Sequence, residues 1–162
     1  MRFFLVVLFT FLYLPALAKE YPAIIGRASV IDGDTIAIHD QRIRIWGIDA
    51  PEAKQLCKDN TGQDERCGQK ASLALDEWIN KSQPIRCEPN SKDRYKRFVA
   101  KCFRFDGKDI AEWLVLNGHA LDWPRYSKGF YDNAQKQASR FKAGIWQGQF
   151  RVPWQWRKRK NN

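Results

Sequence analysis

The chain has 162 residues and a net charge of +10, from 28 lysines and arginines against 18 acidic residues. This length predicts one domain with short appendages, because domains usually contain roughly 100–200 residues. The hydrophobic fraction of 44% excludes a disordered chain, and no apolar run of about 20 residues interrupts the body of the sequence, which excludes a polytopic membrane protein. The positive charge favours polyanionic partners such as nucleic acid or an anionic surface.

The first 18 residues have the pattern of a secretory signal peptide. A positive charge at Arg2 precedes an apolar stretch, and the small-residue sequence Ala-Leu-Ala ends at Ala18. An uncleaved membrane anchor is the alternative, but the stretch is short for a membrane span and contains Pro15. We therefore expect cleavage near Ala18 and a secreted or periplasmic mature protein that does not insert stably into a membrane.

The chain contains four cysteines: Cys57, Cys67, Cys87 and Cys102. An even number behind a signal peptide indicates disulfides, although the sequence allows three pairings. Zinc is the alternative, but the chain has no CxxC pair and only two histidines. We favour Cys57–Cys67, which would close a polar loop, and Cys87–Cys102, which would join two strands of a hairpin.

Residues 23–46 are rich in Ile, Val and Thr with apolar and polar residues in alternation. Turn signals at 32–33 and 39–41 divide this segment, so it predicts two or three antiparallel strands. Residues 49–67 are polar and irregular. From residue 68 to 79, apolar residues recur at helical spacing, which predicts an amphipathic helix.

Strand character returns at residues 85–88 and 98–105, and the turn dipeptide Asp106-Gly107 follows. Asp109 has the properties of a helix N-cap, and Gly118 those of the stop of that helix.

A last helix is predicted from about residue 127 to 142. Its expected inward-facing residues are Phe130, Ala134, Ala138 and Phe141. The order of elements predicts an α+β, mainly β fold: a five-stranded Greek-key barrel of the OB type, built from short antiparallel strands, with three helices.

Acidic and basic residues gather at the predicted strand ends. Asp32 and Asp34 flank a glycine in one turn, while Asp49 and Glu52 follow the alternating strand that carries Arg44. Taken singly, these residues are compatible with an ordinary Asx turn and with solvated charge at a barrel rim.

A further cluster, Asp-Arg-Tyr-Lys-Arg at residues 93–97, is a predicted hairpin tip. Basic tips often serve solubility alone. Together, however, the clusters offer carboxylates for a hard cation such as calcium or magnesium, a possible base, and two arginines, Arg44 and Arg97, that can bind a phosphate. These groups are the requirements for attack on a phosphodiester.

Three motifs occur in a characteristic order: Asp-Gly-Asp-Thr at 32–35, Arg-x4-Asp-x-Pro-Glu at 44–52, and Asp-x-Tyr-x-Arg at 93–97. In this order they resemble the staphylococcal nuclease (thermonuclease) family, and the similarity extends from about Ile25 to Trp146. The resemblance implies an OB-fold barrel with helices, and hydrolysis of DNA and RNA with calcium to leave 3′-phosphates.

The resemblance also implies roles for single residues. Asp34 and Asp49 would be carboxylate ligands of one calcium ion, and the backbone carbonyl of Ala50 would be a further ligand. Ala50 stands where the best-known members carry threonine, so a carbonyl ligand is retained but a hydroxyl contact is lost.

In the same way, Glu52 would be the general base for the attacking water. Arg44 and Arg97 would bind the scissile phosphate and stabilise its transition state, with Arg97 also placed to aid the leaving group.

At the hairpin tip, the resemblance implies that Asp93 supports the site and that Tyr95 contacts a nucleotide. Lys96 stands where the family usually has glycine. Because lysine disfavours a positive φ, we do not expect one at that position. The replacement also adds a cation near the path of the substrate.

The segment 151–162 lies beyond this similarity and contains two tryptophans among five cations. Such a segment suits phosphate contact and base stacking, but the alternative that we favour is that the tryptophans pack on the barrel and the cations are solvated. The expected organisation is thus a signal peptide (1–18), a nuclease-like domain (19–150) and a basic tail (151–162).

From these features we expect a monomeric, calcium-dependent nuclease that cleaves DNA and RNA, preferably single-stranded or locally unpaired. The alternative is a nucleic-acid-binding barrel without catalysis. Such a protein should lack Arg44, Glu52 or Arg97, and all three are present. A cell-envelope module that uses its basic tail is a third possibility.

Overall fold

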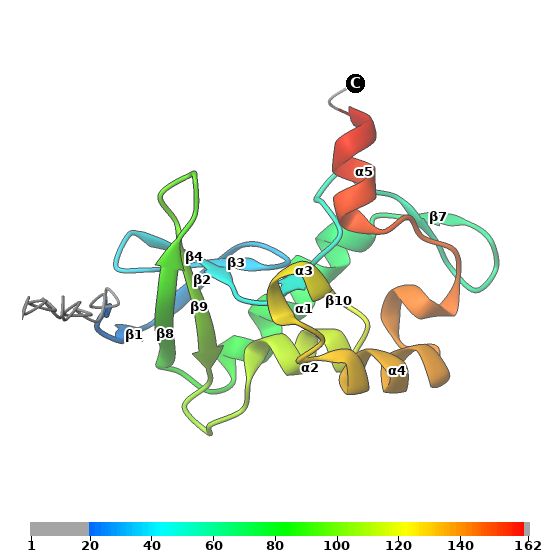
Figure 1. The fold of residues 1–162 in the computed structure, drawn as a ribbon. Helices are drawn as coiled ribbons and strands as arrows, with labels where there is room; N and C mark the ends of the chain where they lie inside the picture. The colour runs from blue at the N-terminus through cyan, green and yellow to red at the C-terminus, as the bar shows by residue number, and fades with distance from the viewer. Residues whose placement is uncertain (1–19, 161–162) are drawn as a thin grey trace, which may run out of the picture.

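The computed structural model describes residues 20–160, so the expected signal peptide at 1–18 lies outside the described residues. Figure 1 shows the arrangement of the elements. In chain order they are β1 (Ile24–Gly26), β2 (Ala28–Asp32), β3 (Thr35–Ile38), β4 (Gln41–Ile45), β5 (Ile48–Asp49), β6 (Cys57–Lys58), β7 (Asp64–Glu65), α1 (Cys67–Asn80), β8 (Ile85–Lys92), β9 (Phe98–Phe103), α2 (Ile110–Leu116), β10 (Leu121–Asp122), α3 (Pro124–Ser127), α4 (Asp132–Arg140), the 3₁₀ turn η1 (Gly144–Gln147) and α5 (Pro153–Lys160).

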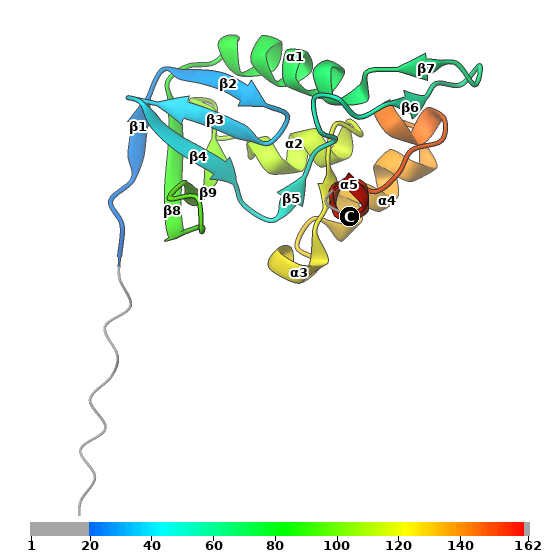
Figure 2. The ribbon, with the colours of Figure 1, turned by 90° about the horizontal axis from the view of Figure 1, so that it is seen from above.

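The main sheet curls into a barrel because its two edges are joined by the chain itself. Its strand order is β1-β8-β9-β4-β3-β2. β1 and β2 are separated only by Arg27, yet they pair with β8 and β3 respectively, at opposite ends of that order. Counted as one bent strand, β1 and β2 complete the OB-like barrel that the sequence predicts (Figure 2).

One strand pairing differs from the expectation of antiparallel neighbours. β4 and β9 are parallel, with Ile43 opposite Phe98, while the other pairs of the main sheet are antiparallel. The chain leaves β4, passes through α1 and β8, and returns in the same direction in β9. A parallel pair requires this kind of long crossover connection.

The barrel core is built from the alternating positions that the strand pattern predicts. Ile36, Ile38, Ile43 and Ile45 are buried on the inner face, and α1 closes one end with Leu75. Burying an aliphatic side chain of this size contributes roughly 1.5–3 kcal/mol. The helix predicted for residues 68–79 is therefore present as α1, and it packs where its apolar stripe requires.

Both favoured disulfides are formed. Cys87–Cys102 joins β8 to β9 inside the barrel core. Cys57–Cys67 closes the polar loop before α1 and belongs to a second, smaller apolar cluster. Leu121 and Ile145 complete that cluster, which the aromatic side chains near the C-terminus cover.

The prediction of a single helix over residues 127–142 is wrong, because α3 ends at Ser127 and α4 covers only Asp132–Arg140. Lys128 and Gly129 both adopt positive φ, of 57° and 82°, which ends α3 before α4 begins. Ala134 and Ala138 are buried as expected, but Phe130 and Phe141 are 59% and 73% exposed. The helical spacing of apolar residues therefore predicted the buried positions correctly only within α4.

Residues 153–160 form a helix, α5, that the sequence did not predict. In both views it lies on the side of the molecule away from β1. Within residues 20–160, none of the helices has both the length and the apolar character needed to cross a bilayer.

Asp109 links two helices and should contribute strongly to stability. Its Oδ1 accepts hydrogen bonds from the backbone N–H groups of Ala111 and Glu112, and its Oδ2 accepts one from the buried hydroxyl of Tyr131. We expect Asp109→Ala to lower the free energy of unfolding by about 2–3 kcal/mol, because a helix cap and a buried hydrogen bond are lost together.

Urea denaturation of the oxidised protein measures this difference. Asp109→Asn is the matched control, since its amide oxygen can still cap α2 and it should lose less. Equal stability of the alanine variant and the wild type would contradict the prediction.

Candidate active site

Two buried carboxylates meet at one end of the barrel. Asp34 lies in the turn between β2 and β3, and Asp49 ends β5; they are 4% and 0% exposed. The guanidinium of Arg44, on β4, lies between them. Its Nη1 donates to Asp34 Oδ1 and its Nη2 to Asp49 Oδ1, both at 2.7 Å. The sequence motifs thus bring these three residues into direct contact.

The strand register explains this convergence. Thr35, next to Asp34, is directly opposite Arg44 in the β3–β4 pair. β5 pairs with β10, so that Asp49 lies opposite Leu121. Carboxylates that are far apart in sequence are therefore fixed by backbone hydrogen bonds rather than by flexible loops.

Burial perturbs the charges of this group. It raises the pKa of Asp49 to about 6, and the guanidinium groups around Asp49 oppose that rise. Burial and the nearby Asp34 raise the pKa of Asp32 to about 6 as well. Although burial lowers the pKa of Arg44, Asp34 and Asp49 raise it, and the net pKa lies above the ordinary value. Arg44 therefore stays charged.

Glu52 follows β5 in a loop whose backbone is tightly fixed. The buried Gln55 accepts a hydrogen bond from Glu52 N–H through its Oε1 and donates its own N–H to the Glu52 carbonyl. At the start of α1, a Cβ on Gly68 would lie only 2.0 Å from the Glu52 carbonyl oxygen. Glycine is thus required there for the helix to approach the loop.

The side chain of Glu52 contacts a residue from the C-terminal helix. Arg157, on α5, donates from Nη1 to Glu52 Oε1 at 2.7 Å and from Nη2 to Asp49 Oδ2 at 2.8 Å. With Arg44, this makes one chain of alternating charges. In order, its members are Asp34, Arg44, Asp49, Arg157 and Glu52.

Trp123 forms the apolar side of this charge chain. The guanidinium carbons of Arg44 and Arg157 lie 5.8 and 5.3 Å from its ring centroid. Trp154, from α5, stacks on the same indole at 5.7 Å with an interplanar angle of 3°. Cation–π contact of this kind favours a guanidinium over the ring face.

The hairpin tip between β8 and β9 brings Arg97 to the site. Asp93 Oδ1 accepts from the backbone N–H groups of Tyr95 and Arg97, and Oδ2 accepts from Arg97 Nε at 2.8 Å. Arg97 Nη1 is 3.4 Å from Thr35 Oγ1, next to Asp34. Burial raises the pKa of Asp93, but the hydrogen bonds from Arg97 outweigh this effect and leave it below its ordinary value. The Asp93 carboxylate is therefore placed to orient Arg97.

Two further tip residues are exposed to solvent. Tyr95 projects from the tip, with the guanidinium groups of Arg94 and Arg97 over its ring. Lys96 has a φ of 65°, so the prediction that a lysine at this position would not adopt a positive φ is wrong. The tight tip, in which Lys96 N–H donates to the Asp93 carbonyl, imposes this conformation on a lysine.

The donors at the barrel end fit a hard divalent cation by their chemistry. Calcium prefers carboxylate and carbonyl oxygens. Asp34 and Asp49 converge on one guanidinium, and with Asp32 and Glu52 there are four carboxylates against the two arginines of the charge chain. Two further positive charges would balance this group, and each carboxylate oxygen that accepts one hydrogen bond retains a second lone pair.

Two observations limit what is preformed for a metal. Within residues 20–160, no three His, Cys, Asp or Glu side chains are already arranged as a metal cluster. Ala50, the predicted carbonyl ligand, is buried, and its N–H donates to Asp34 Oδ2 at 2.9 Å. Asp34, Asp49 and Ala50 are thus adjacent, and they are the residues that could hold the ion.

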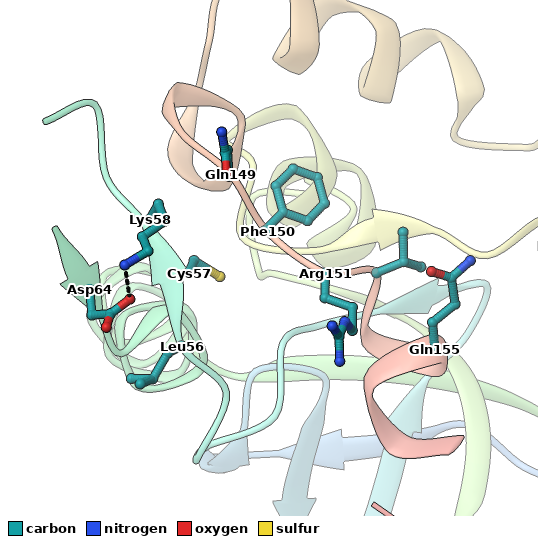
Figure 3. Close-up of a pocket in the computed structure, with 9 residues that line it drawn as sticks. Leu56, Cys57, Lys58, Asp64, Gln149, Phe150, Arg151 and Gln155 are labelled. Carbon is teal, nitrogen blue, oxygen red and sulfur yellow. Dashed lines mark ion pairs between the residues drawn. The ribbon is translucent and has the colours of Figure 1, made fainter. Parts of the chain in front are cut away.

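A separate pocket of about 400 Å³ lies beside this site (Figure 3). It is bordered by residues of the disulfide loop, including Lys58 and its ion-pair partner Asp64, and by the segment that leads into α5. None of the predicted catalytic, metal-binding or substrate-binding residues lines it. Its walls are joined by the hydrogen bond from Lys58 N–H to the Gln149 carbonyl, so the pocket marks where the C-terminal segment is anchored.

Sequence reasoning missed Gln55, Trp123 and Arg157. Gln55 carried no signal, because one glutamine in a polar loop has no pattern. Trp123 follows β10 and was not singled out. The prediction that the tail tryptophans pack and the tail cations are solvated is correct for Trp154, which stacks on Trp123, and for Lys158, which is exposed. It is wrong for Arg157, whose guanidinium enters the site.

The geometry agrees with comparisons with known proteins. The family described as "Staphylococcal nuclease homologue" matches residues 42–148. A protein of Escherichia coli O157:H7 called "Uncharacterized endonuclease" is 31% identical over 160 residues, which are 95% of each chain. The chain therefore belongs to the staphylococcal nuclease family, and the predicted OB-like fold is confirmed.

Two other relatives match over part of their length. "Succinoglycan biosynthesis protein ExoI" of Rhizobium meliloti (strain 1021) is 50% identical over 126 residues, which are 78% of this chain and 66% of that protein. "Probable staphylococcal-like nuclease CAN1" of Oryza sativa subsp. japonica is 27% identical over 132 residues, which are 80% of this chain and 36% of that protein. This chain thus spans just under two thirds of the first protein and about a third of the second.

Lys96 provides a direct test of the tip geometry. We expect Lys96→Gly to raise the free energy of unfolding by about 1 kcal/mol, because a positive φ is strained for lysine and not for glycine. Urea denaturation measures the change. Lys96→Ala removes the same charge but keeps the strain, so a glycine variant no more stable than this alanine variant would refute the idea.

Proposed function

We propose that this protein is a calcium-dependent nuclease that hydrolyses phosphodiester bonds of DNA and RNA and leaves 3′-phosphates. Membership of the staphylococcal nuclease family supports hydrolysis of nucleic acids, as do the nuclease names of the E. coli and rice relatives. The observation that carries the proposal is the meeting of Arg44, Asp34, Asp49, Glu52 and Arg97 from three separate segments at one end of the barrel.

Arg44, on β4, and Arg97, at the hairpin tip between β8 and β9, would bind the scissile phosphate. Arg44 is largely withdrawn from water and keeps its charge, so its attraction for an anion is weakly screened. Arg97 is held by Asp93 through Nε, which leaves its Nη2 without a hydrogen bond to residues 20–160. A guanidinium can hold a phosphate through two parallel hydrogen bonds, which fixes the orientation of the bond to be cleaved.

Glu52 would accept a proton from the attacking water. Its Oε1 is held by Arg157, whereas its Oε2 accepts no hydrogen bond within the described part of the chain. As the water oxygen bonds to phosphorus, the P–O5′ bond breaks and the 3′-phosphate remains on the preceding nucleotide. The leaving 5′-oxygen takes up a proton, and Arg97 would stabilise its developing charge.

Asp34 and Asp49, with the Ala50 carbonyl, would hold the cation. When bound there, calcium would supply positive charge that offsets the negative charge growing on the phosphate. The same arrangement without catalysis would describe a nucleic-acid-binding barrel. The presence of both arginines and Glu52 in contact with the site favours the enzyme.

We also propose that the protein is exported and acts as a monomer on single-stranded or locally unpaired substrate. Two disulfides support an oxidising compartment, because such bonds rarely persist in the cytosol. Sequencing the N-terminus of protein recovered from the periplasm or the medium tests cleavage near Ala18.

Glu52→Gln and Arg97→Ala should each reduce cleavage by at least about 100-fold, the usual scale for a lost proton acceptor or charge stabiliser. The measurement is the initial rate on heat-denatured DNA and on RNA at mildly alkaline pH. Glu88→Gln and Arg86→Ala are matched controls, because these two residues form an exposed ion pair on β8. Near-normal turnover of Glu52→Gln or Arg97→Ala would remove that residue from the mechanism.

Calcium should restore cleavage after treatment with excess chelator, and the products should carry 3′-phosphates. It should also raise the midpoint of thermal unfolding, because a ligand that binds only the folded state stabilises it. Asp49→Asn should abolish this thermal shift. Cleavage that persists in chelator would exclude the calcium requirement, and folded protein that binds DNA without cleaving it would indicate the silent barrel.

A further inference from the structure

The C-terminal helix lies outside the region that matches the family, yet it contributes a side chain to the candidate active site. The family match ends at residue 148, and α5 begins at Pro153. Arg157, on its second turn, donates to both Glu52 and Asp49. Arg157 therefore reaches the candidate active site from outside the residues that match the family.

The packing of α5 fixes the position of Arg157. Trp154, one turn earlier, stacks on Trp123, and the Arg157 guanidinium lies over the same indole. At the base of the helix, the buried Gln55 donates from Nε2 to the Arg151 carbonyl at 2.6 Å. The helix is thus anchored at its start and along one face, which gives its arginine a defined position.

The same anchor point also holds the Glu52 loop. Gln55 bonds both to the backbone of Glu52 and to the segment that leads into α5. The Cys57–Cys67 disulfide begins two residues later, and Cys67 starts α1. The Glu52 loop and α5 are therefore parts of one packed unit.

Glu52 needs an orienting partner. Its side chain is 38% exposed and projects from a loop, so without a contact it would lose little by adopting several rotamers. Arg157 holds one oxygen, Oε1, while the other edge of its planar guanidinium is held by the fully buried Asp49. Because the guanidinium is rigid, fixing one edge on Asp49 fixes the direction of the other.

We propose that Arg157 is a positioning residue that orients Glu52, and that α5 is therefore a working part of the active site rather than a solvated tail. This inference rests on the proposed nuclease function, in which Glu52 accepts the proton of the attacking water. Arg157 acts through Glu52 and does not itself contact the substrate. Its contribution should appear in turnover and not in substrate affinity.

The test compares Arg157→Ala, Arg157→Lys, Glu52→Gln and the double variant Arg157→Ala/Glu52→Gln on the same DNA substrate with calcium. We expect Arg157→Ala to lower kcat by about 10- to 100-fold with little change in KM, because a positioned base of this kind supplies about 10²–10⁴-fold. Arg157→Lys should recover only part of the loss, since a lysine cannot bridge two carboxylates with a fixed fork.

The double variant is the decisive measurement. If Arg157 acts through Glu52, its loss should lower kcat no further once Glu52 is glutamine; because Arg157 also contacts Asp49, the comparison is made at saturating calcium. Arg159→Ala is the matched control, because it removes the same charge from the exposed side of the same helix. Thermal unfolding of all variants verifies that α5 and the barrel remain folded, and added methylguanidinium should partly restore Arg157→Ala.

Four results would overturn the inference. Higher activity of Arg157→Ala than of the wild type would mean that the arginine blocks the site. An increase in KM that persists in the Glu52→Gln background would make it a substrate contact. Full activity of Arg157→Ala, with Glu52→Gln inactive, would show that Arg157 has no role in catalysis while Glu52 keeps its own. Full activity of Glu52→Gln would exclude Glu52 as the base, and with it the proposed role of Arg157.

Discussion

The burial of Asp49 between two guanidinium groups is the constraint on which the site depends. A carboxylate with no solvent exposure requires hydrogen bonds and opposite charge, and it receives both from Arg44 on one side and Arg157 on the other. Removing either arginine would leave a buried charge with half of its partners. Three parts of the chain must therefore fold together at this point: the strand before Asp49, the loop after it and the C-terminal helix.

The same constraint links architecture to chemistry. The barrel places Asp34 and Arg44 through strand register, while the pairing of β5 with β10 brings Trp123 beneath both arginines. Trp154 then connects α5 to that indole. Strands and the tight turns between them hold the groups that would bind metal and phosphate, whereas the loop that carries Glu52 depends on packing from α1 and α5. Such a division leaves Glu52 as the part of the site most sensitive to distant substitutions.

Local patterns were reliable where a single physical cause operates. Alternation predicted β3 and β4, the helical period predicted α1, and Asp109 caps α2 through its own side chain as expected. Prediction failed where tertiary contacts overrode local preference. A left-handed Lys128-Gly129 pair divides the last predicted helix, and the hairpin tip imposes a positive φ on Lys96. Neither lysine has an intrinsic tendency toward that conformation.

The sequence by itself determined the family, the barrel and the identity of the residues in its three motifs. Those features depend on short-range spacing, which a linear chain records directly. Only the tertiary structure decided that Arg157, rather than Arg151, Lys158 or Arg159, reaches Glu52 and Asp49. That choice depends on the angle at which α5 leaves the domain, which the Trp123–Trp154 stack and the Gln55 hydrogen bonds determine. Contacts between residues about 100 positions apart have no signature in a single sequence, because their energy exists only once the chain is folded.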